Sequence, residues 1–393
     1  MRIKSFAKVN LGLEVLGLRP DGYHNLRTLI QSVSLADELA FFPESGGRVV
    51  LHGSDPSIPW DKTNLVFRAA RALKDRYPRT PGARIEVTKS IPTGTGLGGG
   101  SSNAAMTLLG LDRLWGLGLE KEELMDIGRS LGADVPYFLR GGLCLGLDRG
   151  DRIVPLEDLP ALPLVIALPP FSCRTADIYR EHRLALMGGE VSLLPGQART
   201  AKGWRGEGAP APGPWRGKRS AFPLPTVASL PASPSRTSSC DQGGIPPWNP
   251  RSASAERAAW PRARPGKSRD RTPLQSSLTP GKEWPASGVK LTSAVEDSRI
   301  EQFFRSRELR FLENNLEATV FRFHPRLQDL KALFRSRGAE LSLVTGSGSA
   351  VFGLFRDKRQ AEEAGRAAER EYPAVLAETV PRGRYEGEMW AGV

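Results

Sequence analysis

The sequence predicts an α+β fold built from two domains. Its 393 residues are enough for two domains at a prior of roughly 150 residues each. Segments with a strand period alternate with segments with a helix period, and several of the strands are joined by short turns of the hairpin type. Hairpins between strands favour an α+β arrangement over a purely parallel sheet.

The N-terminal part begins with a predicted β-hairpin. An apolar period of two marks a half-buried first strand. Its apolar face carries Val9, Leu11, Leu13 and Val15, and its other face carries Lys8, Asn10 and Gly12. The tripeptide Pro20-Asp21-Gly22 predicts a tight turn, because proline presets φ and glycine accepts a positive φ. Tyr23 and His24 leave this turn, and residues 26–35 form the predicted return strand.

The remaining elements follow from the same periodicities. Helices are predicted at 64–77, 101–115, 120–131, 300–323, 327–337 and 357–372, and strands at 85–87, 143–147, 164–168, 341–344 and 351–355. The third helix is followed by Gly132-Ala133-Asp134-Val135-Pro136. Asp134 is therefore expected just past a helix end, before a proline that disfavours more helix.

The formal charge of +12 is concentrated in one segment. Residues 188–289 hold 15 Lys and Arg against 6 Asp and Glu, so nine of the excess positive charges lie there. The same segment is rich in proline and has no helix or strand period, so it cannot bury enough apolar area to offset chain entropy. We expect a disordered insertion. Its basic charge leaves nucleic-acid binding open, although we expect none.

The lack of a targeting signal and the scattered cysteines predict a cytoplasmic protein. Cys144, Cys173 and Cys240 are scattered without the spacing of a metal site, which suits a reducing cytosol. No signal-peptide core follows Met1. No run approaches the roughly 18 apolar residues of a membrane span, so we expect no membrane partner.

A glycine-rich stretch lies between the predicted strand at 85–87 and the helix at 101–115. Its candidate ligand-binding residues are Pro92, Thr93, Gly94, Thr95, Gly96, Leu97, Gly98, Gly99, Gly100, Ser101 and Ser102. Glycine lets backbone amides approach a ligand closely. A helix N-terminus that opens out of such a loop favours anions through its free N–H groups and its dipole. The stretch therefore predicts a phosphate cradle.

Two better-known phosphate loops do not fit this stretch. A dinucleotide-binding loop needs an acidic residue at the end of a second strand about 20 residues on. Here residues 120–123 resemble the first turn of a helix. A P-loop needs Gly-Lys-Ser/Thr at its end, and no lysine stands there. A glycine-rich turn without any ligand stays open as the alternative.

Three motifs in order resemble those of the GHMP kinases, the superfamily of galactokinase, homoserine kinase, mevalonate kinase and phosphomevalonate kinase. They are Lys8-x-Asn10, the glycine-serine stretch, and Gly346-Ser347-Gly348-Ser349. The resemblance narrows to those members that phosphorylate a cytidine-diphosphate-linked alcohol in the non-mevalonate route to isoprenoids. This narrower match rests on residues 7–11, Arg19-Pro20-Asp21-Gly22-Tyr23-His24, residues 98–104 and residues 132–136. It covers about 1–186 and 290–355.

The resemblance implies a two-domain fold. An N-terminal ATP-binding domain at 1–158 would be similar to ribosomal protein S5 domain 2. A ferredoxin-like domain would occupy 159–393, interrupted by the insertion at 188–289. The loop at 346–349 would close on the substrate phosphates, or else be a tight hairpin turn that needs small residues.

The resemblance also assigns two catalytic residues, Lys8 and Asp134. A carboxylate can orient a hydroxyl and accept its proton. A nearby ammonium keeps that carboxylate ionised and stabilises charge on the transferring group. Taken singly, Lys8 could be a solvated strand lysine and Asp134 a turn former at a helix end.

The substrate and cofactor expectations follow from the same resemblance. The substrate-binding candidates are Asn10, Tyr23, His24, Thr175 and Tyr179. Tyr23, His24 and Tyr179 would hold the cytidine base, unless His24 is an ordinary turn histidine and Tyr179 a core aromatic. ATP would be the phosphate donor and Mg²⁺ would arrive with it, with metal ligands unknown. A monomer or homodimer is expected.

Two alternative functions stay open. One is a GHMP kinase for another small alcohol, and the other is a nucleic-acid-binding or scaffold protein acting through the insertion.

Overall fold

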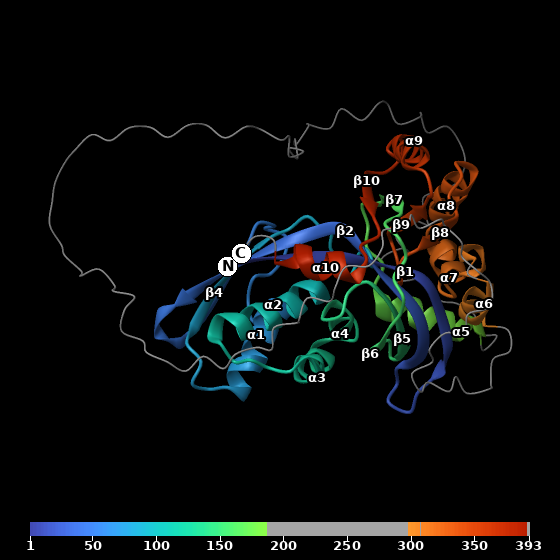
Figure 1. Ribbon diagram of the computed structural model, residues 1–393. Coiled ribbons are helices and arrows are strands. Elements are labelled where there is room, and N and C mark those ends of the chain that lie inside the picture. Colours follow the sequence, from blue (N-terminus) through green and yellow to red (C-terminus); the bar gives the residue numbers. More distant parts are fainter. Residues whose placement is uncertain (187–297, 307, 391–393) are drawn as a thin grey trace, which may run out of the picture. The chain divides into compact units, whose positions relative to one another are not determined.

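The structure is a computed structural model that describes residues 1–186, 298–306 and 308–390. These residues belong to one compact unit of the chain (Figure 1). The predicted disordered insertion at 188–289, and with it any nucleic-acid binding by that segment, lies outside the described residues.

The first sheet is organised by a long N-terminal hairpin, which Figure 1 shows in blue. Its strands are β1 (Arg2–Leu18), β2 (His24–Glu44), β3 (Val49–Gly53), β4 (Gly82–Thr88), β5 (Leu143–Asp148) and β6 (Arg152–Pro155). The strand order is β3-β4-β2-β5-β6, and β1 pairs with β2 from Leu18↔His24 to Arg2↔Ala40. Strand β2 pairs with β5 through its first half and with β4 through its second half.

The second sheet has the order β10-β7-β9-β8. Its strands are β7 (Pro163–Ala167), β8 (Leu341–Val344), β9 (Val351–Leu354) and β10 (Ala374–Glu378). Alternate residues of β7 belong to two different cores. Leu164 and Ile166 pack with β1 residues such as Val9, whereas Val165 and Ala167 pack with apolar helix residues. Each face of this sheet is therefore covered.

Helices complete these cores. They are α1 (Leu65–Arg76), α2 (Gly99–Trp115), α3 (Lys121–Leu131), α4 (Val135–Phe138), α5 (Thr175–Leu186), α6 (Arg299–Ser306), α7 (Glu317–Phe323), α8 (Arg326–Ser336), α9 (Lys358–Ala368) and α10 (Arg382–Met389). The short 3₁₀ helices are η1 (Ser45–Gly47) and η3 (Leu309–Phe311). Apolar residues of α1 to α4 pack with those of the first sheet, and apolar residues of α7 to α9 pack with those of the second.

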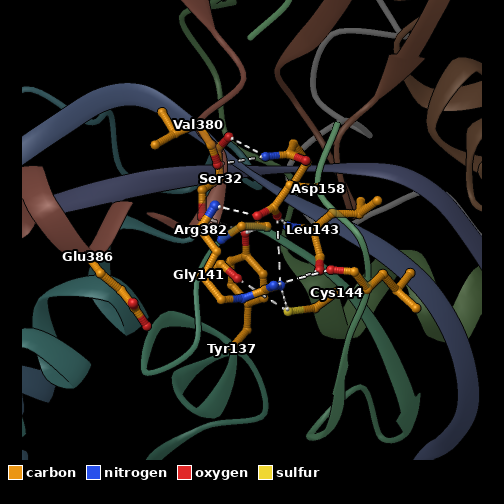
Figure 2. Close-up of polar contacts among 12 residues, drawn as sticks. Ser32, Tyr137, Gly141, Leu143, Cys144, Asp158, Val380, Arg382 and Glu386 are labelled. Atoms are coloured by element: carbon orange, nitrogen blue, oxygen red, sulfur yellow. Dashed lines mark hydrogen bonds and ion pairs between the residues drawn. The ribbon is translucent and has the colours of Figure 1, made fainter. Parts of the chain in front are cut away.

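Helix α10 packs into the core of the first sheet, far from it in sequence. The ring centroids of Tyr385 and Phe6 are 5.2 Å apart, and the Tyr385 hydroxyl donates to the Phe138 carbonyl at 2.7 Å. Arg382 Nη2 donates to the Leu143 carbonyl at 2.7 Å, and Asp158 Oδ2 accepts from the Arg382 amide at 2.7 Å (Figure 2). This network ties α10 to the start of β5.

The predicted α+β class is confirmed, and three local predictions are wrong. The first strand was expected to be half-buried, but residues 5–14 are buried on both faces because the second sheet packs on it. The single helix expected at 300–323 is broken into α6, η3 and α7. Its middle pairs with β1 instead, since Leu13 N donates to Glu313 O and Asn315 N donates to Leu13 O, both at 2.8 Å.

The third correction concerns the proline after Asp134. Helix α4 follows directly, with Pro136 in its first turn, where a missing N–H leaves no intrahelical bond unmade. Strands β3, β6 and β10 and helix α10 are further elements that the sequence patterns did not reveal. Within the described ranges, no helix combines the length and the apolar character that a bilayer crossing requires.

Candidate active site

The centre of β1 places Lys8 and Asn10 in a buried polar position. Their residues are 4% and 3% exposed. Lys8 Nζ donates to Asn10 Oδ1 and lies 3.9 Å from Asp134 Oδ2. Asn10 Nδ2 donates to Thr28 Oγ1 at 2.8 Å. This bond orients the Asn10 side chain, so that its Oδ1 accepts the hydrogen bond from Lys8. Burial lowers the pKa of Lys8, and the nearby Asp134 charge opposes that shift.

Asp134 stands at the N-cap of α4 with a side chain that is 41% exposed. Its carboxylate caps none of the α4 amides, so it stays free to accept other donors. The helix behind it is fixed by Tyr137, whose hydroxyl lies 2.7 Å from Ser32 Oγ and donates to the Gly142 carbonyl at 2.9 Å (Figure 2). Asp134 therefore stands at the end of a buried helix that Tyr137 holds in place.

The glycine stretch forms a loop whose backbone needs glycine at specific points. Gly94, Gly96 and Gly98 all have positive φ. A Cβ on Gly96 would lie 2.2 Å from the Thr345 carbonyl oxygen, and one on Gly98 would lie 2.8 Å from the Phe138 ring. Larger residues would therefore push the loop off its neighbours.

Helix α2 opens directly out of this loop. Its N-cap, Gly98, offers no side chain to the first amides of the helix, so these amides stay available to a ligand. A cavity of about 270 Å³ is lined by every loop residue from Pro92 to Ser101.

Ser102, also a sequence candidate, does not line that cavity. It is fully buried, its hydroxyl donates to the Phe6 carbonyl at 2.7 Å, and it accepts from Ser5 Oγ at 2.7 Å. Its hydroxyl therefore joins α2 to β1.

A second loop, residues 345–350, packs against the first. Asn10 N donates to Thr345 Oγ1 at 3.1 Å, and Ala350 N donates to the Thr95 carbonyl at 3.1 Å. Ser347 Oγ lies 2.9 Å from Thr175 Oγ1 at the start of α5. The structure thus brings the three sequence motifs together around β1.

The main cavity has a volume of about 740 Å³. All the candidate catalytic and substrate-binding residues line it: Lys8, Asn10, Tyr23, His24, Asp134, Thr175 and Tyr179. It shares Gly96, Gly98 and Ser101 with the loop cavity, so the two spaces meet at the helix start. Lys8 and Asp134 line the main cavity together with these three shared residues.

Aromatic rings line part of the main cavity. The rings of His24 and Tyr179 have centroids 5.2 Å apart at an interplanar angle of 35°. Tyr23 is 57% exposed, with the Arg149 guanidinium 5.1 Å from its ring centroid. The tyrosine at 179 is therefore not only a core aromatic: it presents a ring beside His24 in the cavity.

Burial sets the protonation of these two side chains. The pKa of Tyr179 is raised by burial and then by the Asp134 charge, which keeps its hydroxyl neutral. The pKa of His24 is lowered by burial and then by the Arg183 charge, so its imidazole is neutral at pH 7. His24 Nε2 is buried without a hydrogen-bond partner among the described residues. A ligand in the cavity could satisfy it.

Several residues of the site were missed from the sequence. Arg149, Arg180 and Arg183 line the main cavity, and Thr28 supports Asn10. Arg183 stands four positions after Tyr179 on α5, a spacing that the sequence could have offered as a signal, whereas Arg180 directly follows Tyr179 and gives no such signal. Arg149 lies in the turn between β5 and β6, where no local pattern marks it.

The described residues contain no cluster of three or more metal-binding side chains. The main cavity has a single acidic residue in its lining, Asp134. A divalent cation in this cavity would meet a single carboxylate, and it would need oxygens from a ligand to complete its coordination.

Comparison with known proteins points to one family. Two family models match, described as the GHMP kinases N terminal domain, at residues 64–142, and the GHMP kinases C terminal, at residues 294–374. A curated relative from Acaryochloris marina (strain MBIC 11017), "4-diphosphocytidyl-2-C-methyl-D-erythritol kinase", is 32% identical over 92% of this chain and 88% of the relative. One of the same name from Moorella thermoacetica (strain ATCC 39073 / JCM 9320) is 31% identical over 96% and 97%.

A solved structure agrees with these relatives. The crystal structure of a 4-(cytidine 5'-diphospho)-2C-methyl-D-erythritol kinase superposes with a TM-score of 0.59 at 27% identity, over 96% of this chain and 99% of that one. The likeness extends over both sheets and the helices that cover them.

Proposed function

Because the chain belongs to the 4-diphosphocytidyl-2-C-methyl-D-erythritol kinases, a family of GHMP kinases, we propose that it phosphorylates the 2-hydroxyl of that diphosphocytidyl alcohol with ATP. The observation that carries the proposal is the junction of the two cavities. There the phosphate-type loop, a lysine and an uncapped carboxylate meet beside an aromatic wall.

The loop cavity is the proposed site of the ATP phosphates. The open amides at the start of α2 and the helix dipole both favour an anion there. Mg²⁺ bound to the phosphates would neutralise part of their charge, and Ser101 and Asp134, which both line the main cavity, could help hold it.

Asp134 is the proposed general base and Lys8 its partner. The carboxylate accepts the proton of the substrate hydroxyl as the hydroxyl oxygen bonds to the terminal phosphorus of ATP. The bond from that phosphorus to the bridging oxygen breaks, and ADP leaves. The Lys8 ammonium, 3.9 Å from Asp134 Oδ2, pairs with the carboxylate and stabilises charge on the transferring group. Phosphoryl transfer depends mainly on such positioning and charge stabilisation.

The charge of the main cavity supports an anionic alcohol as substrate. Four cationic side chains, Lys8, Arg149, Arg180 and Arg183, line it against the single carboxylate of Asp134. A diphosphate linker would be attracted to these guanidinium groups, which bind phosphate oxygens with strong charge-assisted hydrogen bonds. Asp151 already pairs with Arg149, and Asp177 and Glu181 pair with Arg180, so the cavity offers positioned guanidinium groups that a small neutral alcohol would not engage.

The aromatic wall supports a nucleobase at the far end of the substrate. His24, Tyr179 and Tyr23 present rings to the cavity, and base–aromatic stacking contributes ~1–3 kcal/mol per base. Asn10 and Thr175 line the same cavity and could hydrogen-bond the alcohol or its phosphates. A cytoplasmic location and a monomeric or homodimeric state, both predicted from the sequence, accompany this proposal.

A substrate panel tests the proposal. Purified protein with MgATP should turn over the diphosphocytidyl alcohol and leave mevalonate and homoserine unchanged, as followed by ADP release. Turnover of mevalonate or homoserine, with none of the diphosphocytidyl alcohol, would assign the chain to another GHMP kinase activity. Absence of turnover with all three would refute the proposed reaction.

A further inference from the structure

A second lysine–aspartate pair lies behind the glycine loop, and the reaction as proposed above does not use it. Asp37 lies in β2 opposite Ser5 and is 1% exposed. It forms an ion pair with Lys89, whose side chain is 7% exposed. A buried carboxylate is tolerated only when its charge and lone pairs are matched by partners.

The partners of Asp37 come from both ends of the glycine loop. Oδ1 accepts from the backbone amides of Ser90, at 2.7 Å, and Ile91, at 2.8 Å. Oδ2 accepts from Asn103 Nδ2 at 3.0 Å and from the Lys89 ammonium. Lys89, Ser90 and Ile91 precede the loop, whereas Asn103 lies in α2 after it. One carboxylate therefore fixes where the loop begins and where its helix stands.

The same pair places a cation at the loop cavity. Lys89 is among the residues that line this cavity. Its Nζ lies 3.2 Å from where a Cβ on Gly99, the first residue of α2, would stand. The ammonium is thus held beside the open amides that favour an anion. A group that holds a loop in its ligand-binding shape improves affinity, because the bound ligand no longer has to order that loop.

The structure assigns to Asp37 the role of a positioning residue for the nucleotide. It holds both ends of the phosphate loop and the Lys89 ammonium in the geometry that receives ATP. The inference rests on the proposed function only in placing ATP in the loop cavity, and it does not depend on which alcohol is phosphorylated. It follows that loss of the carboxylate weakens ATP binding and leaves the handling of the alcohol intact.

The experiment compares Asp37→Asn with a matched control in the full chain. Asparagine keeps an oxygen for the two amides but removes the charge that faces Lys89. The control, Asp75→Asn, removes an exposed carboxylate of α1 that pairs with Arg71 at the surface. Calorimetric Kd for ADP, KM for ATP, KM for the alcohol, kcat and the melting temperature are measured for each variant.

We expect Asp37→Asn to raise the ADP Kd and the ATP KM about tenfold, as for loss of a hydrogen-bonded charge. The KM for the alcohol should stay within twofold of wild type, and Asp75→Asn should change none of these constants. A lowered melting temperature with an unchanged ADP Kd would overturn the proposal, since it would show a role in folding alone.

A milder variant covers the case in which Asp37→Asn does not fold. Asn103→Ser removes one donor and leaves the carboxylate with its other partners, so the ADP Kd should rise about threefold. An unchanged ADP Kd in folded Asn103→Ser would overturn the proposal. ADP binding needs no acceptor alcohol, so a wild-type protein that binds ADP but does not phosphorylate the diphosphocytidyl alcohol would refute the proposed function and leave this test valid.

Discussion

Two lysine–aspartate pairs flank the glycine loop, and they differ in how completely they are bonded. Lys8 and Asp134 lie 3.9 Å apart, with the lysine side chain 5% and the aspartate side chain 41% exposed. Lys89 and Asp37 are in direct contact, with side-chain exposures of 7% and 0%. Both pairs line or adjoin a cavity, and both consist of the same residue types.

The difference lies in spare hydrogen-bonding capacity. Each oxygen of Asp37 already accepts two donors, so this carboxylate can only hold its neighbours in place. The carboxylate of Asp134 has the distant Lys8 ammonium as its ion-pair partner within the described ranges and caps no amide. A carboxylate with free lone pairs beside a cavity can receive a proton from a ligand. The comparison teaches that residue identity alone does not separate the pair proposed to react from the pair proposed to support the loop.

The largest expected effect is on kcat and follows from removing the Asp134 carboxylate. Asp134→Asn should lower kcat by about 10²–10⁴-fold, the usual contribution of a general base. The ADP Kd should stay within twofold of wild type, because the amide loop is untouched. Steady-state kinetics and calorimetry together check this outcome. Near-normal turnover would remove Asp134 from the chemistry.

A smaller effect concerns the ring beside the reactive pair. Tyr179→Leu should raise the KM for the diphosphocytidyl alcohol about tenfold, as expected for loss of one stacked base. Tyr179→Phe keeps the ring and should restore the wild-type value. The KM for ATP should not change in either variant, in contrast to Asp37→Asn. An equal effect of the leucine and phenylalanine variants would argue against stacking.

The pH dependence of kcat tests whether the two lysine–aspartate pairs act independently. Burial lowers the pKa of Lys8 from its ordinary value of 10.5. The ammonium is charged below that lowered pKa and loses its proton as the pH rises through it. The alkaline limb of kcat should therefore lie below pH 10.5, and Asp37→Asn should leave it in place. A limb that moves in Asp37→Asn would mean that the two pairs are electrostatically coupled.

The smallest expected effect tests Ser102, which the sequence placed in the nucleotide site. Ser102→Ala leaves the Phe6 carbonyl and the Ser5 hydroxyl without their buried partner. The free energy of unfolding should fall by about 1 kcal/mol, measured by denaturant titration. The KM for ATP should match wild type. A raised KM without lost stability would return Ser102 to the phosphate site.

The candidate catalytic residues were predicted from short motifs together with the GHMP kinase resemblance that these motifs carry. Lys8, Asn10 and the loop at 92–101 stand in short motifs whose chemistry can be reasoned from residue type and order. Asp134 was placed correctly after a helix end, although the helix that follows it was not expected. The alternation of β1 also put Lys8 and Asn10 on one face, which the structure retains.

Long-range contacts explain what could not be predicted. Asp37 sits inside an apolar stretch of β2, and its four donors come from residues more than fifty positions away. The break in the helix at 300–323 comes from pairing with Leu13, which no local period reveals. The burial of both faces of β1 likewise depends on a sheet whose strands lie far along the chain.

The position of α10 has a consequence for biosynthesis. A ribosome makes β1, α4 and β5 long before it makes Tyr385 and Arg382, yet these two side chains contact all three elements. The core of the first sheet therefore stays incomplete on the nascent chain until α10 has been made. A message cut short before codon 382 would encode Lys8 and Asp134, the proposed catalytic residues, and still leave that core without Arg382 and Tyr385, so limited proteolysis should distinguish such copies from the full chain.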